Sequence, residues 1–167
     1  MGHPVLRERA RALDKSDIKN AVVQKLIDDM IDTMQEYHGV GLAAPQVHEG
    51  LRIFVGMLEE DPDQKSTASV IINPEIVPNA PATEEGWEGC LSIPDIRGMV
   101  PRFTDITVKA LDRAGHKVEL TLKNFAARVT QHETDHLDGV LFFDRMTSMQ
   151  SLTFLEEYSR FWAKDED

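Results

Sequence analysis

The sequence has only one cysteine, Cys90, among its 167 residues. A single thiol cannot form a disulfide within the chain, so nothing in the sequence requires an oxidising compartment. In a reducing compartment a lone cysteine is either a small buried hydrophobic residue or a functional thiol, acting as a nucleophile or a metal ligand. Both interpretations of Cys90 are open at this point.

Basic residues and long apolar runs are also scarce. The chain has 18 Lys and Arg against 29 Asp and Glu, which gives a net charge of −11. A negative field of this kind disfavours direct binding of nucleic acid or of anionic lipid. No apolar run approaches the ~20 residues that a bilayer-spanning helix needs, and the first residues lack the apolar stretch of a secretory signal. We therefore expect a cytoplasmic protein with no membrane partner.

The residues that are present suit a single folded domain spanning residues 1–167. Hydrophobic residues make up 41% of the chain, and a chain of this length buries roughly two-thirds of the surface that it exposes when unfolded. No internal repeat, low-complexity tract or linker divides it.

Three helices are predicted from apolar spacing and capping residues. The first spans residues 17–37, with Ser16 as its N-cap and Gly39 at its end. A second has Asn124 as its N-cap, runs to 137 or 138 and is closed by Gly139. A third lies within residues 152–162. The apolar residues that define the first helix are Ile18, Val22, Leu26, Met30 and Met34.

Strands are predicted between the first two helices. Their residues are 51–57, 69–73, 105–112 and 117–122, the last two joined by a hairpin turn at 112–115, and the charged segment 59–67 is predicted to be a solvent-exposed loop. Because the strands cluster without helices alternating between them, the predicted fold class is α+β. We expect mixed or antiparallel sheets packed around the central helix that begins at Asn124, with an N-terminal and a C-terminal helix.

The sharpest local signal is an H-E-x-x-H motif in that central helix, formed by His132, Glu133 and His136. Four residues of helix turn through about 400°, so the two imidazoles lie one turn apart on one face and can share a cation. Glu133 then stands beside a metal-bound water and can act as a general base. The alternative is that these are ordinary solvated side chains on a helical surface.

A catalytic metal site needs about three protein ligands and an open position for water. The lone thiol of Cys90 lies upstream in the segment Glu88-Gly89-Cys90-Leu91-Ser92. A thiolate with two imidazoles makes a donor set that suits Zn2+ or Fe2+.

A third cluster, GVGLAAPQ at residues 39–46, follows the first helix. Its glycines let the backbone approach a ligand closely, and the Gln46 side chain offers an amide donor to a developing oxyanion. A glycine-rich segment at a helix end can equally be a simple turn.

Taken together, the three motifs closely resemble those of the peptide deformylase family, G-x-G-x-A-A-x-Q, E-G-C-x-S and Q-H-E-x-D-H-x-x-G. They occur here in the same order as GVGLAAPQ (39–46), EGCLS (88–92) and QHETDHLDG (131–139). The resemblance runs over nearly the whole chain, from about Gly2 to the region of Phe143.

The resemblance implies that Cys90, His132 and His136 hold a metal, usually Fe2+, with Zn2+, Ni2+ or Co2+ as substitutes. The implied reaction is removal of the N-formyl group from the initiator methionine of newly made polypeptides, with release of formate. A metal-bound water is the nucleophile, and Glu133 is the general base and acid. The Gln46 amide and the Leu91 backbone N–H would stabilise the oxyanion.

The resemblance also implies how substrate binds. Val40 and Gly41 would pair with the substrate main chain, while Phe125 and Val129 would line the methionine pocket, although these two can also be plain core residues. The implied partners are N-formyl-methionyl nascent polypeptides. Family members can dock on the ribosome through a basic C-terminal helix, whereas this chain ends in the acidic EEYSRFWAKDED, which argues against docking by that element.

Two further functions remain as hypotheses. A broader zinc amidase or peptidase built on H-E-x-x-H would take a downstream Glu or His as its third ligand in place of Cys90. A partner-binding module without turnover would be free to lose the base or a ligand, yet Glu133, Cys90 and Gln46 are all present.

Overall fold

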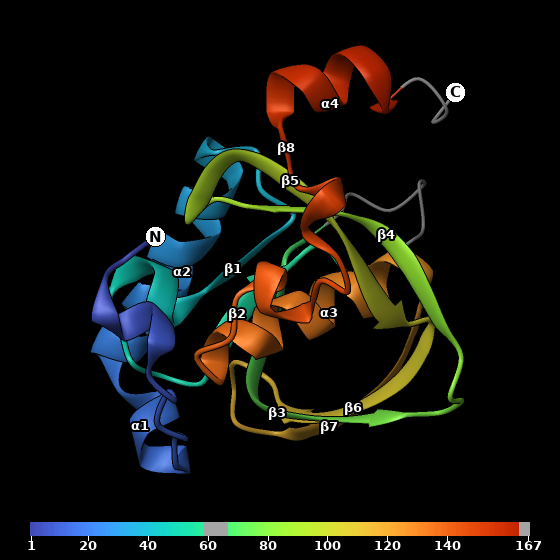
Figure 1. Ribbon diagram of the computed structural model, residues 1–167. Helices are drawn as coiled ribbons and strands as arrows, with labels where there is room; N and C mark the ends of the chain where they lie inside the picture. Colours follow the sequence, from blue (N-terminus) through green and yellow to red (C-terminus); the bar gives the residue numbers. More distant parts are fainter. Residues whose placement is uncertain (59–66, 164–167) are drawn as a thin grey trace.

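The computed structural model describes residues 1–58 and 67–163. The predicted loop at 59–67 falls almost entirely outside the described residues. Within them, every strand pair in the sheets is antiparallel, and helices pack against the sheets (Figure 1). The predicted α+β class is confirmed.

The N-terminal region contains a 3-10 turn and two helices: η1 (Pro4–Arg7), α1 (Lys15–Lys19) and α2 (Ala21–Glu36). The prediction of one continuous helix over 17–37 is therefore wrong. The chain breaks at Asn20, whose backbone is extended (φ −67°, ψ 132°) and whose side chain accepts a hydrogen bond from the Val22 amide at 2.9 Å. Asn20 thus acts as the N-cap of α2, and this local hydrogen bond competes successfully with continuation of the first helix.

The predicted cap of the first helix is also corrected. Asp14, rather than Ser16, caps α1, because its carboxylate accepts from the amides of Ser16 and Asp17. The break between the helices shifts the helical phase, so Val22 is 75% exposed, while Met30 and Met34 are buried as expected.

A five-stranded sheet has the order β1-β2-β3-β6-β7. Its strands are β1 (Gly41–Ala43), β2 (Ile53–Gly56), β3 (Ser69–Pro78), β6 (Asp105–Leu111) and β7 (Lys117–Lys123). All four predicted strands lie in it, although β3 continues five residues beyond its predicted end. Both faces of β2 are covered, since Phe54 packs toward α3 while Ile53 and Val55 pack toward α2, which accounts for its unbroken apolar sequence.

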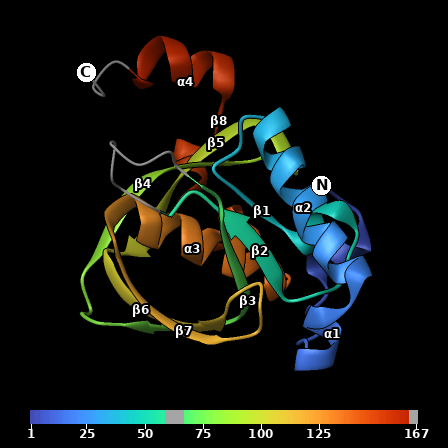
Figure 2. The same cartoon turned by 180° about the vertical axis from the view of Figure 1, so that it is seen from behind.

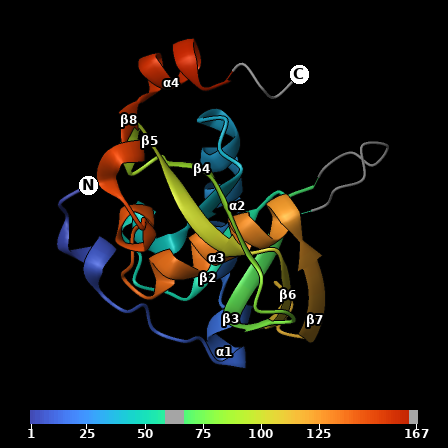
Figure 3. The same cartoon turned by 45° about the vertical axis from the view of Figure 1, so that its right-hand side comes forward.

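A second, three-stranded sheet has the order β4-β5-β8 and was not predicted. Its strands are β4 (Thr83–Cys90), β5 (Ile93–Phe103) and β8 (Thr153–Phe154). Figures 1 and 3 show β4 and β5 on one side of helix α3 (Asn124–Leu137), while β3, β6 and β7 curve around its other side.

Helix α3 is the central helix of the fold, and ten of its residues are buried. It starts one residue earlier than predicted, since Lys123 is the N-cap residue and Asn124, the predicted cap, is the first residue of the helix, with φ of 46°. It ends before Gly139, as expected. Gly139 has φ of 73°, and a Cβ there would lie 2.5 Å from the carbonyl oxygen of Arg7, so only glycine fits.

The C-terminal part contains the 3-10 turns η3 (Phe142–Arg145) and η4 (Met149–Ser151) and the helix α4 (Leu155–Phe161); another turn, η2 (Ala44–Val47), follows β1. Helix α4 lies within the predicted range 152–162 but begins only at Leu155, and Figure 2 shows it standing apart from the main body. Trp87 of β4 contacts its Tyr158 ring at 5.1 Å between centroids. Among the described helices, none combines the length and the apolar character that a bilayer crossing demands.

Candidate metal centre

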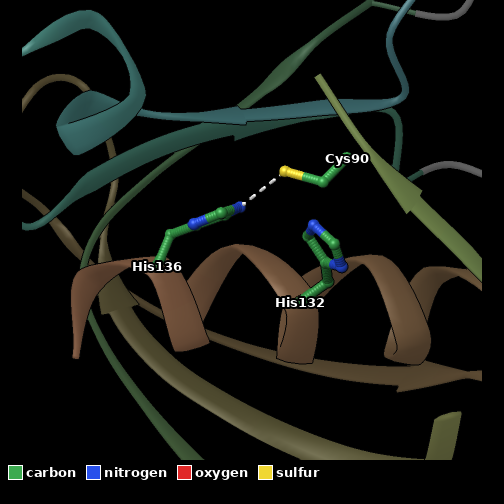
Figure 4. Close-up of side chains that lie close together, drawn as sticks. All are labelled: Cys90, His132 and His136. Atoms are coloured by element: carbon green, nitrogen blue, oxygen red, sulfur yellow. Dashed lines mark hydrogen bonds between the residues drawn. The ribbon is translucent and has the colours of Figure 1, made fainter. Parts of the chain in front are cut away.

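Three predicted ligands meet between β4 and α3. Figure 4 shows Cys90 pointing from its strand toward His132 and His136, which stand on the same side of the helix. The Cys90 Sγ lies 3.3 Å from the His136 Nε2, and the ligand atoms of all three residues lie within 4.8 Å of one another. In the part of the chain that the structure describes, this is the one group of three such side chains close enough for a metal ion.

The donor chemistry fits a divalent cation. A thiolate and two imidazoles bind Zn2+ or Fe2+ at about 2.0–2.3 Å per ligand, which requires donor atoms about as close together as these are. The third side chain of the cluster is Cys90 rather than a downstream Glu or His, so this candidate donor set differs from that expected for the broader zinc peptidase. Cys90 also packs in a hydrophobic cluster with Ile93 and Phe142, but its sulfur faces the imidazoles.

Glu88 orients His132. Its Oε2 lies 2.9 Å from the His132 Nδ1, and the Arg102 guanidinium donates to both of its carboxylate oxygens at 2.9 and 3.0 Å. Burial alone would raise the pKa of Glu88, but hydrogen bonds from His132 and Arg102 outweigh it and lower the pKa to about 2. The ionised carboxylate keeps a proton on Nδ1, which leaves Nε2 of His132 as the candidate ligand atom.

The pKa values of the two imidazoles are shifted in opposite directions. Burial lowers the pKa of His136 to about 3, so this ring is neutral and ready to ligate. For His132, burial acts in the same direction but is outweighed by hydrogen bonds to Cys90 and Glu88, which raise its pKa to about 10. A cation at its Nε2 would therefore displace a proton, and metal binding would release that proton to solvent.

The network extends from Glu88 through Arg102 to Asp135 of α3. The Arg102 guanidinium also donates to Asp135 at 2.6 Å, and Arg145 donates to the other Asp135 oxygen at 2.8 Å. Arg102 and Asp135 are both buried. A continuous chain of charge-assisted hydrogen bonds thus supports His132 from behind the site.

Glu133 lies beside the ligands with its carboxylate only partly satisfied. The side chain is buried, and its Oε2 has no hydrogen-bond partner among the described residues. Burial raises the pKa of Glu133 to about 7, close to the value that suits a group exchanging protons near neutrality. A Cβ on Gly41 would lie 2.3 Å from the Glu133 Oε1, so this glycine is needed for the carboxylate to occupy its place.

Gln46 is held in a fixed orientation. Its Oε1 accepts from the Ala43 amide at 2.9 Å, which directs its Nε2 toward the Ser92 Oγ at 3.2 Å and the Cys90 Sγ at 3.5 Å. Leu91 directly follows Cys90, and its side chain is 41% exposed. The amide of Gln46 therefore lies next to the sulfur of Cys90, one of the three candidate ligands.

A pocket of about 580 Å³ is lined by all but one of the predicted site residues. The predicted residues that line it are Val40, Gly41, Gln46, Cys90, Leu91, Phe125, Val129, His132 and Glu133. His136 lies beneath it, with 1% of its surface exposed. Phe125 is 55% exposed, so its interpretation as a core residue is wrong, whereas Val129 is buried against both the core and the pocket.

Sequence reasoning missed the supporting residues Glu88, Arg102, Asp135 and Arg128. Glu88 lies two residues before Cys90, which places both on the same side of a strand. That spacing could have identified it, had residues 83–90 been predicted as a strand.

Comparisons with known proteins agree with this geometry. A family model described as polypeptide deformylase matches residues 1–152. A protein from Nostoc sp. named peptide deformylase 2 is 43% identical over 171 residues, which cover 99% of this chain and 93% of the relative.

Solved structures show the same fold. A peptide deformylase from Thermotoga maritima is 44% identical with a TM-score of 0.79, and the match covers 88% of this chain and 94% of that one. A class I type b peptide deformylase from Acinetobacter baumannii is 40% identical with a TM-score of 0.79, covering 86% and 94% of the two chains.

Proposed function

This chain belongs to the peptide deformylase family, and we propose that it hydrolyses the N-formyl group of initiator methionine with Glu133 as the residue that carries the proton. The observation that carries the proposal is that Cys90, His132 and His136 lie close together. Beside them is the buried Glu133 Oε2, which has no hydrogen-bond partner among the described residues. The activity would be exerted on newly made polypeptides in the cytoplasm.

Cys90, His132 and His136 would hold the metal, with Fe2+ as the proposed ion and Zn2+, Ni2+ or Co2+ as substitutes. When bound, such an ion lowers the pKa of a coordinated water and polarises the formyl oxygen. Support for this donor set comes from the proximity of the three ligand atoms and from the fixed Nδ1 of His132.

Glu133 would take a proton from the attacking water and return it to the leaving amine. Its burial supports this role, because a carboxylate with a pKa of about 7 can both accept and donate near neutral pH. Its carboxylate lies in space that a Cβ on residue 41 would occupy, so the position depends on glycine there.

The formyl oxygen gains negative charge as its carbon becomes tetrahedral. The Gln46 Nε2 and the Leu91 backbone N–H would donate hydrogen bonds to it, and loss of one such donor typically raises the barrier by about 3 kcal/mol. Support comes from the Gln46 Oε1, which is tied to the Ala43 amide and so directs the donor end into the pocket.

The substrate main chain would add to the five-stranded sheet. Strand β1 is the terminal strand of that sheet, and Val40 and Gly41 at its start line the pocket. Main-chain hydrogen bonds to an edge strand do not depend on the side chains of the substrate, so many nascent sequences can bind. Phe125 and Val129 would contact the methionine side chain.

The direct test is formate release from formyl-Met-Ala-Ser by protein purified and metal-loaded without oxygen. We expect turnover by the native chain and a loss of at least roughly a hundredfold in Glu133→Gln, because the proton carrier is removed. Glu119→Gln on exposed strand β7 is the matched control and should retain activity. Metal-loaded native protein that releases no formate would contradict the proposal.

A further inference from the structure

A second cavity, of about 550 Å³, lies against the face of α3 that carries Gln131, Thr134, Asp135 and Asp138. These positions fall three or four residues apart along the helix, so they share one face. Among the described residues, none lines both this cavity and the pocket beside the candidate metal centre. Helix α3 therefore separates two cavities, and the proposed function takes place in only one of them.

The second cavity combines arginines with an apolar surface. Basic residues outnumber acidic ones in its lining, whereas over the whole chain 29 acidic residues stand against 18 basic ones. The arginines are Arg9, Arg52, Arg102 and Arg145. The apolar surface is formed by Pro74, Ile76, Pro78, Pro101 and Phe103. A ligand that joins one negative charge to an apolar body would match both surfaces.

Two of these arginines bind a carboxylate through the edge of the guanidinium that Nε and Nη2 form. Arg102 places this edge on Glu88, with hydrogen bonds of 2.9 and 3.0 Å. Arg145 places the same edge on Asp135, with hydrogen bonds of 3.2 and 2.8 Å. Two parallel N–H groups match the two oxygens of a carboxylate, which gives such pairs both strength and a defined orientation.

Arg52 differs from them, because its Nε and Nη2 have no hydrogen-bond partner among the described residues. Its Nη1 alone is bonded, to the Leu137 carbonyl oxygen at 3.0 Å and to the Asp138 Oδ1 at 2.8 Å. The residue is buried, with 9% of its surface exposed. Neither Nε nor Nη2 is among the fully buried polar atoms that lack a partner, so solvent reaches both. The guanidinium is thus fixed at Nη1, while its carboxylate-binding edge is accessible in a residue that lines the cavity.

We propose that this cavity binds a small amphipathic monocarboxylate, whose carboxylate pairs with Nε and Nη2 of Arg52 and whose apolar body packs on Ile76 and Phe103. Arg9 adds a second positive charge, since its side chain is 81% exposed and its ion pair with Asp138 is loose, at 3.9 Å. A dianion such as a phosphate ester is disfavoured, because acidic residues also line the cavity. The proposal goes beyond the deformylase function and does not depend on it.

The experiment follows the δ1-methyl NMR signal of Ile76 while octanoate is added to the Zn2+-loaded protein. Ile76 lines the cavity, whereas Ile93 packs beside Cys90 and reports on the candidate metal centre. We expect a saturable shift of the Ile76 signal with a dissociation constant of about 1 mM or lower, and no matching shift of Ile93. Octanamide, which has the same apolar chain without the charge, should bind at least about tenfold more weakly.

Arg52→Lys keeps the positive charge but removes the paired N–H groups, and it should weaken octanoate binding by roughly tenfold. Arg160→Lys, outside the cavity, is the matched control and should keep the native constant. An Ile76 signal that octanoate leaves unshifted, or an unchanged constant in Arg52→Lys, would overturn the proposal. Equal binding of octanoate and octanamide would overturn it on the native protein alone, even if Arg52→Lys does not fold. The shift is measured without turnover, so failure of the formate assay leaves this test intact.

Discussion

The Glu88 carboxylate is shared by three side chains, since Arg102, Arg128 and His132 all bind it within 3.0 Å. A buried carboxylate with this many partners fixes the imidazole that it touches, and such supporting residues contribute substantially to metal affinity. It also links the candidate ligand His132 to Arg128, which lines the same pocket.

Glu88→Gln should weaken metal binding about 10- to 100-fold, because an amide cannot hold the proton on the His132 Nδ1 as strongly as a carboxylate does. Competition with a chromophoric chelator measures the dissociation constant directly. Glu119→Gln serves again as the control. An unchanged constant in Glu88→Gln would show that the ligand needs no such support.

Gly41→Ala should lower kcat about tenfold or more while metal content stays constant. The new methyl group would meet the Glu133 carboxylate at 2.3 Å and displace the proposed proton carrier, and small displacements of a reacting group are costly. Gly50→Ala is the matched control, because a Cβ there has no neighbour within 4 Å. Equal rates for the two variants would contradict the close contact.

At the scale of elements, the break between α1 and α2 depends on one side chain. Asn20→Ala removes the acceptor for the Val22 amide and should destabilise the protein by about 1 kcal/mol, as measured by urea unfolding. Gln35→Ala, at an exposed position of α2, should change stability much less. A loss of similar size in both variants would mean that Asn20 is not a working cap.

The elements that carry local sequence patterns were predictable. His132, Glu133 and His136 lie within five residues of one helix, so their geometry follows from helical repeat alone. The paired strands β6 and β7 alternate in polarity and flank a turn at Gly115, whose φ is 83°.

Strands β4 and β5 could not be found by hydrophobic periodicity. In Thr83–Cys90 the most buried positions are Glu88 and Cys90. One of the two inward-facing side chains is therefore a charged carboxylate, and the arginines that pair with it come close only in the folded chain. The ion pairs of Arg102 link residues far apart in sequence, and no local pattern encodes them. The prediction that Cys90 is a metal ligand came from the family resemblance, because no local pattern in residues 83–90 indicates it.

At the scale of the whole molecule, an ion pair joins the N-terminal region to the segment that follows α3. Arg7 of η1 donates to Asp144 of η3, 137 residues away. Burial alone would raise the pKa of Asp144, but the hydrogen bonds from Arg7 and from the Leu141 amide hold it below its usual value of 3.8.

Asp144→Asn should therefore lower the free energy of unfolding by up to about 1 kcal/mol at pH 7, a small value because the pair is partly exposed and screened. A depressed folded pKa contributes stability above about pH 4 that is lost as the pH falls through that pKa. Urea unfolding of both proteins at pH 7, 5 and 3.5 should show the gap closing. A gap that is constant across this range would contradict the assigned ionisation.

The placement of Cys90 on the three-stranded sheet, 46 residues before His136 on the helix that packs against the five-stranded sheet, has a thermal consequence. A metal ion bound by Cys90 and by the histidines of α3 would link two layers that are otherwise joined by packing and by buried ion pairs. Differential scanning calorimetry of the loaded protein should give one sharp endotherm. After chelation the heat absorption should broaden or divide, with the β4–β5 layer melting at the lower temperature.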